Sequence, residues 1–294
     1  MYHTLDLHFQ GYEHAIAAFV IESSEGPILI ESGPYSTFHV LEKSLAEIGY
    51  KTEDIKHVLL SHIHFDHAGA AWAFAKKGAT IYLHPFGADH MHDPTKLVAS
   101  ATMIYGDQMD VLWGRMEGIP RENLTIMSHE EKLIIGDQQF TALHTPGHAK
   151  HHIAWEWGKT IFTGDVAGVK IENGPVVPPC PPPDINLEDW MASIDLVLSR
   201  NPERLALTHF AERINVKEHM TDLKNVLNDW GGWIKAKMDE GISKEDMVPQ
   251  FMEYTNAQLR SYGVSEEGLK QYEAANPAWM SVAGLVRYWK KKGS

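Results

Sequence analysis

Short apolar runs bounded by turn residues fill the first part of the chain and predict buried strands. Two such runs, at 14–23 and 26–32, are separated by a Gly-Pro turn, and a third lies at 55–62. Residues 36–49 carry apolar positions at helical spacing and close on a glycine, which predicts a helix between the second and third strands. This alternation of strands and helices indicates an α/β fold.

The middle of the chain predicts antiparallel pairing. A short helix and a strand are predicted over 68–85, and a pair of strands over 131–147. Residues 153–165 contain two apolar runs on either side of Gly158 and Lys159, a two-residue hairpin signal. Strands joined by so tight a turn are antiparallel, so we do not expect a purely parallel sheet.

Three segments depart from this pattern. Residues 85–120 hold many polar and aromatic side chains without strand alternation, and we expect an inserted excursion or lid there. Residues 174–184, GPVVPPCPPPD, contain too many prolines for a regular element and predict a stiff extended loop. From about residue 215 the apolar positions recur at helical spacing. The expected organisation is therefore a domain over residues 1–214 followed by a helical extension over residues 215–294.

Composition narrows the class of protein. The chain of 294 residues is 44% hydrophobic, enough for a full core, and its net charge of -13 argues against general affinity for nucleic acid or anionic membranes. No apolar run approaches the ~20 residues of a membrane span, and the first residues lack the pattern of a signal peptide. We therefore expect a cytoplasmic protein that acts on a small molecule. The single cysteine, Cys180, excludes a cysteine-based metal cluster, so any metal ligands must be His, Asp or Glu.

The stretch LLSHIHFDHAGA, residues 59–70, places histidines and an aspartate directly after an apolar run. Alternate side chains of an extended segment point the same way, so His62 and His64 can share one cation. Asp66 and His67, at the turn into the next helix, can face a second cation nearby. The alternative is a solvated loop, since a chain with 18 histidines brings some together by chance.

Three later apolar runs also end on residues able to bind metal. LHTPGHAKHH supplies His148, TIFTGDVAG supplies Asp165, and RLALTHF supplies His209. A strand end can hold such a side chain rigidly while it faces a cleft. The full set is five His and two Asp, and these nitrogen and oxygen ligands suit Zn, with Fe or Mn as alternatives.

The motifs SHIHFDHAG, HTPGHAKHH, FTGD and LTHF occur in an order that resembles hydrolases of the metallo-β-lactamase superfamily. The resemblance implies an αβ/βα sandwich with two metal ions at one edge. This chain has Glu31 where the family usually has Asp, and Ser61 where the family usually has Thr. Neither difference removes a ligand. The ligands that the resemblance implies are His62, His64 and His148 for the first metal, Asp66, His67 and His209 for the second, and Asp165 as the bridge.

Two adjacent cations lower the pKa of a shared water enough to give hydroxide at neutral pH. The resemblance then implies a binuclear hydrolase in which Asp66 also orients the hydroxide, as the catalytic residue. Glu31, at a neighbouring strand end, is a candidate partner for a ligand histidine. His152 is a further candidate for a supporting or catalytic role.

The substrate has several possible identities. The helical residues after the last ligand are similar to those of hydroxyacylglutathione hydrolase, the glyoxalase II type, which favours a thioester, with a lactone next. Homoserine lactonases typically place a tyrosine shortly after the bridging aspartate, where this chain reads GDVAGVK. A phosphodiesterase on the same fold, a mononuclear-iron persulfide dioxygenase and a flavodiiron oxidoreductase are the alternatives.

Side chains outside the ligand set would shape the pocket and the assembly. Tyr105, Trp113 and His90 would line the pocket from the excursion, and Lys150 would meet an anionic substrate tail. The apolar segment PAWMSVAGLVRYW, at 277–289, exceeds what a small appendage can bury and predicts a homodimer.

Overall fold

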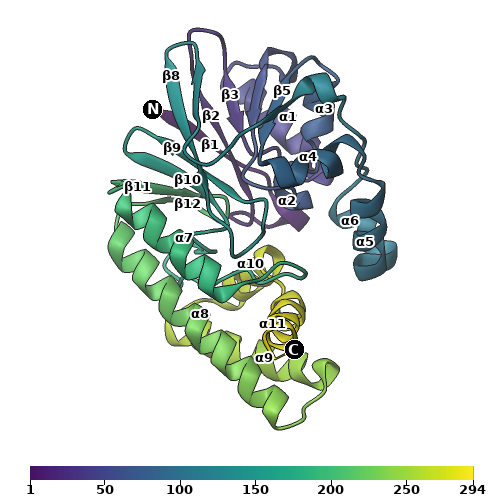
Figure 1. Ribbon diagram of the computed structural model, residues 1–294, viewed down its shortest axis with the longest axis vertical. Helices are drawn as coiled ribbons and strands as arrows, with labels where there is room; N and C mark the ends of the chain where they lie inside the picture. Colours follow the sequence, from purple (N-terminus) through teal and green to yellow (C-terminus); the bar gives the residue numbers. More distant parts are fainter. Residues whose placement is uncertain (294) are drawn as a thin grey trace.

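Two six-stranded mixed sheets lie face to face in the computed structural model, which describes residues 1–293 (Figure 1). The first sheet has the order β1-β2-β3-β4-β5-β6, and the second has the order β12-β11-β10-β9-β8-β7. The strands of the first sheet are β1 (Tyr2–Asp6), β2 (Ala17–Ile21), β3 (Ile28–Ile30), β4 (His57–Leu59), β5 (Thr80–Leu83) and β6 (Leu124–Ile126). Those of the second are β7 (Lys132–Ile135), β8 (Gln138–His144), β9 (Ile153–Trp157), β10 (Thr160–Gly164), β11 (Arg204–Leu207) and β12 (Ala211–Arg213).

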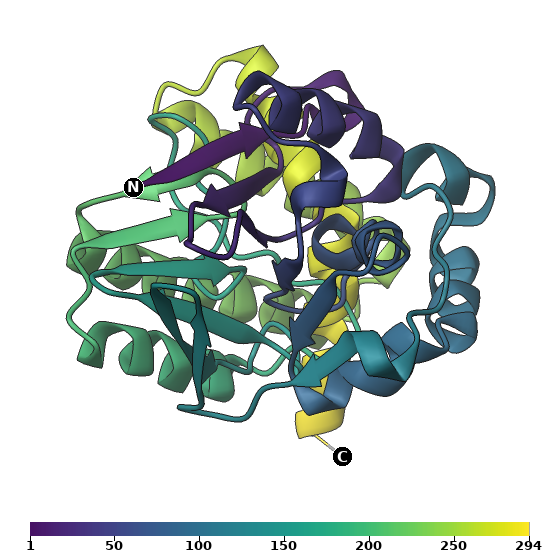
Figure 2. The same ribbon diagram turned by 90° about the horizontal axis from the view of Figure 1, so that it is seen from above.

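Helices cover the outer face of each sheet. They are α1 (Phe38–Glu47), α2 (Phe65–Ala68), α3 (Ala71–Ala75), α4 (Pro85–His92), α5 (Thr95–Tyr105), α6 (Met109–Leu112), α7 (Leu187–Ser199), α8 (Val216–Asp239), α9 (Lys244–Ser261), α10 (Glu266–Ala275) and α11 (Ala278–Lys292). Short 3-10 helices lie at Phe9–Gly11, Tyr35–Thr37, Thr52–Asp54, Gly106–Gln108 and Arg121–Asn123. Seen from above, the sheets lie between α1 and α3 on one side and α7 and α8 on the other (Figure 2).

Successive side chains of each strand point to opposite faces of its sheet, and this explains the layering. In β3, Ile28 and Ile30 point into the core between the sheets, whereas Leu29 points into the core beneath α1 and α3. Strand β2 divides in the same way: Phe19 lies between the sheets and Val20 lies under the helices. Because both faces are buried, these strands are apolar throughout rather than alternating. The αβ/βα sandwich expected from the sequence is confirmed.

Most of the predicted elements are present. The hairpin at Gly158 and Lys159 joins antiparallel β9 and β10, and residues 174–184 form an extended loop with a single β-bridge at Val177. The excursion over 85–120 contains helices α4, α5 and α6. Helices α8 to α11 form the C-terminal helical region, and the domain boundary at residue 214 stays a prediction.

Strands β1, β6 and β12 and helix α7 are additional to the predicted elements. Strands of three residues, such as β6 and β12, are too short to show an alternation in the sequence. Helix α7 does carry a start signal, because the Asn186 side chain accepts a hydrogen bond from the Asp189 N–H. Within residues 1–293, no helix is both long and apolar enough to cross a membrane.

Helix α11 packs tightly against the proline-rich loop. Gly284 lies so close to that loop that a Cβ atom would overlap the carbonyl oxygen of Cys180. Gly284→Ala should therefore push α11 off the loop and lower the free energy of unfolding by about 1–3 kcal/mol. Urea unfolding followed by circular dichroism measures the change.

Gly232 provides a matched control for this substitution. It lies exposed in helix α8, and an added Cβ would meet nothing within 4 Å. Gly232→Ala should leave stability unchanged or raise it by about 0.5–1 kcal/mol, because alanine is the better helix former. If both variants unfold at the same urea concentration as the parent protein, the close packing at Gly284 does not contribute to stability.

Candidate metal centre

Strand ends from both sheets bring the predicted ligands together. His62, His64, Asp66 and His67 follow β4 and lead into α2, and His148 lies on the loop after β8. Asp165 directly follows β10, and His209 lies two residues after β11. These strand ends place all seven side chains in two adjoining groups that share one aspartate.

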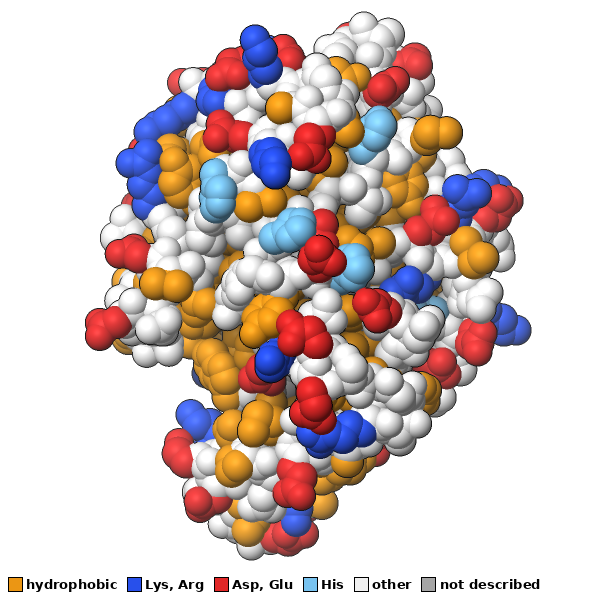
Figure 3. Space-filling view, turned by 180° about the vertical axis from the view of Figure 1, so that it is seen from behind, with side chains coloured by type: hydrophobic (Ala, Val, Ile, Leu, Met, Phe, Trp, Pro, Cys, Tyr) orange, Lys and Arg blue, Asp and Glu red, His pale blue; other side chains and the backbone are white. Residues whose placement is uncertain are grey.

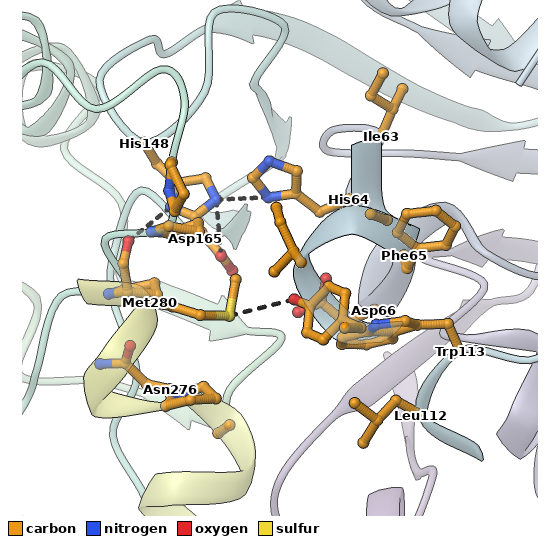
Figure 4. Close-up of a pocket in the computed structure, with 18 of the residues that line it drawn as sticks. Ile63, His64, Phe65, Asp66, Leu112, Trp113, His148, Asp165, Asn276 and Met280 are labelled. Carbon is orange, nitrogen blue, oxygen red and sulfur yellow. Dashed lines mark hydrogen bonds and ion pairs between the residues drawn. The ribbon is translucent and has the colours of Figure 1, made fainter. Parts of the chain in front are cut away.

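The first group consists of three imidazoles. The Nδ1 atom of His64 lies 2.9 Å from Nε2 of His62 and 3.0 Å from Nε2 of His148. Their ligand atoms all lie within 4.8 Å of one another, as a shared cation requires. Figure 4 shows His64 and His148 pointing toward each other across the floor of the cleft.

The second group consists of Asp66, His67 and His209. Oδ2 of Asp66 lies 3.5 Å from Nε2 of both histidines. These ligand atoms also lie within 4.8 Å of one another. One carboxylate and two imidazoles form a second donor set that suits a divalent cation.

Asp165 connects the two groups through different oxygens. Its Oδ2 lies 3.2 Å from Nε2 of His148, whereas its Oδ1 lies 3.2 Å from Nε2 of His67 and 3.3 Å from Nε2 of His209. One carboxylate oxygen therefore faces each group. This is the arrangement that a carboxylate bridging two cations needs.

Three of these atoms have no hydrogen-bond partner within the described part of the chain. They are Nε2 of His67, Nε2 of His209 and Oδ1 of Asp165, and all three are buried. Buried polar atoms are normally paired, and an unpaired one calls for a specific explanation such as an ion. Since the three atoms lie close together, the residues present fit a bound cation.

Contacts on the far side of the ring hold three of the histidines in place. Nδ1 of His148 donates to the carbonyl oxygen of Pro179 at 2.8 Å, and Nδ1 of His209 donates to that of Ala15 at 2.6 Å. Nδ1 of His67 lies 3.1 Å from Oε1 of Glu31. With Nδ1 occupied in this way, Nε2 of His67, His148 and His209 is left as the metal ligand. Glu31 therefore takes the partner role that the sequence suggested.

His152 supports Asp165 and does not face the cleft. Its Nε2 accepts a hydrogen bond from the backbone N–H of Asp165 at 3.0 Å, and its Nδ1 lies 2.7 Å from Oγ1 of Thr145. Gly164 has φ of 48°, and a Cβ atom there would overlap His152 and Ser61. The glycine of the FTGD motif thus lets the backbone approach both side chains. The sequence alone does not show this role.

The two groups differ in their affinity for protons. Burial, followed by the charges of neighbouring histidines, lowers the pKa of His62 well below its usual value and that of His64 to about 4. Burial also acts to lower the pKa of His209, but Asp165 and Asp66 outweigh it and raise that pKa to about 9. The first group thus offers neutral imidazoles, whereas Asp66 in the second group, together with the shared Asp165, attracts positive charge there.

A cleft of about 1210 Å³ opens above the centre. The excursion lines one wall, and helices α10 and α11 with the proline-rich loop line the other. Hydrophobic side chains gather in the hollow between these parts on the back of the molecule (Figure 3). Tyr105, Trp113 and His90 line this cleft as predicted.

Lys150, the remaining candidate from the sequence, and two other side chains have local roles. Lys150 lines the cleft but also lies 3.5 Å from Oδ1 of Asp184, so its charge is partly neutralised. His84 is buried outside the cleft lining: its Nδ1 accepts from the N–H of Phe86 at the start of α4, and its ring stacks on His144. Cys180 is buried, and burial raises the pKa of its thiol.

Comparisons with known proteins find relatives of this chain. The family model for the Metallo-beta-lactamase superfamily matches residues 11–209. A metallo-beta-lactamase fold-containing protein from Sulfurisphaera tokodaii is 26% identical over 209 residues, which cover 67% of this chain and 77% of that protein. An N-acyl homoserine lactonase from Bacillus cereus is 26% identical over 157 residues, which cover 46% of this chain and 54% of the lactonase.

A solved structure matches over nearly the whole chain. It is a metallo-beta-lactamase family protein from Thermus thermophilus, with a TM-score of 0.71 and 20% sequence identity. The match covers 99% of this chain and 94% of that one. The fold that the two proteins share therefore includes the C-terminal helical region.

Proposed function

Because this chain belongs to the metallo-beta-lactamase superfamily, we propose that it is a binuclear metal-dependent hydrolase that cleaves a lactone or an acyl thioester. The observation that carries the proposal is the position of Asp165, whose two oxygens face separate groups of ligands. A centre for one cation would not need a carboxylate whose two oxygens face different groups of ligands. We assign His62, His64, Asp66, His67, His148, Asp165 and His209 as the ligands.

Two divalent cations, zinc first and iron or manganese as alternatives, would supply hydroxide at neutral pH and polarise the attacked carbonyl group. The protein contributes position and charge. Asp66 lies both in the second group and in the lining of the cleft, so its carboxylate can accept a hydrogen bond from the attacking hydroxide and orient it. His67, His148 and His209 keep their orientation through contacts at Nδ1, so these ligands do not have to rearrange as the reaction proceeds.

The cleft suits a substrate with an apolar acyl chain. Its walls above the ligands include Phe9, Leu97, Ile104 and Trp279. Such walls exclude water from the reacting bond and strengthen the electrostatic contacts within the site. A small-molecule substrate and a homodimer are part of the same proposal.

Two observations favour different leaving groups. The similarity to N-acyl homoserine lactonases supports a lactone, although it spans about half of this chain. The helical region that borders the cleft supports a thioester, because such a region is suited to hold the carrier part of a larger substrate. Both substrates contain an activated carbonyl carbon, which is the common element of the proposal.

A comparison of three substrates under one metal condition tests the reaction class. We expect kcat/KM of at least about 10⁴ M⁻¹s⁻¹ for either an N-acyl homoserine lactone or an acyl-glutathione, and a far lower value for bis-p-nitrophenyl phosphate. Protein treated with a chelator is the control and should be inactive. If the phosphodiester is cleaved much faster than both carbonyl substrates, the centre serves phosphoryl chemistry. Consumption of O₂ with glutathione persulfide, without hydrolysis, would instead identify a dioxygenase.

A further inference from the structure

The phenol ring of Tyr105 is held in the cleft from both sides. Tyr105 is the last residue of α5, in the excursion. Its ring makes an edge contact with Trp113 at 5.3 Å between centroids and another with Trp279, on α11, at 5.7 Å. The side chain therefore joins the excursion to the C-terminal helical region across the cleft that both line.

The hydroxyl group of Tyr105 is poorly matched to its protein partner. It donates to Sδ of Met280, with an O to S distance of 3.2 Å. A thioether sulfur is a weak acceptor, whereas a phenol is a good donor that usually finds an oxygen when it is buried. The hydroxyl can therefore exchange this contact for a better acceptor at small cost.

The hydroxyl of Tyr105 shares the cleft with Asp66, a member of the second ligand group, and is subject to its charge. Figure 4 draws the hydrogen bond to the Met280 sulfur as a dashed line within the cleft that Asp66 also lines. Burial, and then the negative charge of Asp66, raise the pKa of Tyr105. At neutral pH the phenol consequently keeps its proton and acts as a hydrogen-bond donor.

We propose that Tyr105 is a catalytic residue that donates a hydrogen bond to the substrate oxygen on which negative charge develops. The inference rests on the proposed hydrolysis of a carbonyl substrate. As the hydroxide oxygen bonds to the carbonyl carbon, the π electron pair moves onto the carbonyl oxygen, and the Tyr105 hydroxyl moves from Met280 to that oxygen. The pair then reforms the carbonyl as the bond to the leaving group breaks. The leaving oxygen or sulfur keeps the bonding pair and takes the proton of the added hydroxyl, so that a carboxylate and an alcohol or thiol result. The phenol proton stays on Tyr105 throughout.

Tyr105→Phe tests this role because it keeps the ring and removes the hydroxyl alone. The ring should remain between Trp113 and Trp279, and the metal content should not change. We expect kcat to fall on the order of 10²-fold, as for the loss of one donor to a developing oxyanion. Tyr262→Phe, at an exposed tyrosine that follows α9, is the matched control and should behave as the parent protein.

Met280→Leu separates a contact with substrate from a purely structural bond. This substitution removes the sulfur acceptor while keeping a side chain of similar size, so it breaks the same bond without removing the phenol donor. If the hydroxyl contacts substrate, Met280→Leu should lose far less of kcat than Tyr105→Phe. Equal losses in the two variants, or parental kcat in Tyr105→Phe, would overturn the inference.

A binding measurement tests Tyr105 independently of turnover. Monoethyl hexylphosphonate carries the anionic tetrahedral centre that the attacked carbonyl acquires, and its affinity can be measured by calorimetry on the metal-loaded protein. Tyr105→Phe should bind it about 10-fold or more weakly, because a hydrogen bond to a charged group is lost. If the parent protein hydrolyses neither carbonyl substrate, the proposed function fails, and this titration alone decides the role of Tyr105. Equal affinity in both proteins would then refute it.

Discussion

Asp165→Ala is expected to abolish turnover and to lower the metal content of a folded protein. The side chain is buried, and its two oxygens lie 3.2–3.3 Å from ligand nitrogens of both groups. Without it, the two groups lose their shared negative charge, and a cation on either side loses a ligand. Stabilisation of the transition state by the metals amounts to several kcal/mol, so kcat/KM should fall by at least about 10³-fold.

Two companion variants make this experiment specific. Asp165→Asn keeps the shape of the side chain and removes its charge, so it should also lose metal and activity if the carboxylate bridges two cations. Asp195→Ala removes an exposed aspartate of α7 that pairs with Lys224, and it should retain both. Metal content by mass spectrometry, turnover, and circular dichroism would be measured on all three. Parental metal content and kcat/KM in Asp165→Ala would show that the carboxylate does not hold the centre.

Truncation after residue 214 is expected to prevent stable folding. Helices α7 and α8 and the helices after them share one hydrophobic core with the second sheet, to which Trp190, Leu227 and Phe251 contribute fully or almost fully buried side chains. Burial of one such side chain stabilises a protein by about 1.5–3 kcal/mol, and the core contains many of them. Exposing this face removes more than the roughly 5–15 kcal/mol by which a folded chain is stable.

The truncation should also disturb the metal centre. Tyr272, on α10, donates a hydrogen bond to the carbonyl oxygen of Pro175, and Asn276 donates to that of Pro178. The next residue, Pro179, accepts the hydrogen bond from Nδ1 of His148. The C-terminal helices therefore position a ligand through the proline-rich loop.

Thermal unfolding and zinc titration of the fragment 1–214 measure both effects. We expect no cooperative unfolding transition and no tight zinc binding. A fragment that unfolds cooperatively and binds as much zinc as the whole chain would show that the helical region is dispensable for the centre.

The candidate ligands were accessible to prediction because each follows an apolar run. His62, His148 and His209 are far apart along the chain, but each comes shortly after a buried strand. A rigid strand fixes the position of the residues that directly follow it. The spacing of the residues after β4 then indicates that His62 and His64 face one cation, whereas Asp66 and His67 face another. These signals are local in the sequence. The residues that they indicate lie together in the structure.

The surroundings of the centre were not accessible in the same way. Nδ1 of His209 donates to the carbonyl oxygen of Ala15, and the Tyr105 hydroxyl meets Met280, contacts that join distant parts of the sequence. A backbone carbonyl leaves no mark in the sequence, and the Tyr105 contact depends on how the excursion packs against α11. Such features follow from tertiary packing, which patterns along the chain do not specify.

Metal stoichiometry tests the central claim most directly. The parent protein would be purified without chelator, loaded with zinc, dialysed, and analysed by mass spectrometry, with calorimetric titration of the metal-free protein as a second measure. The account predicts about two equivalents of zinc per chain, because two groups of ligands share Asp165. One equivalent or fewer would contradict it.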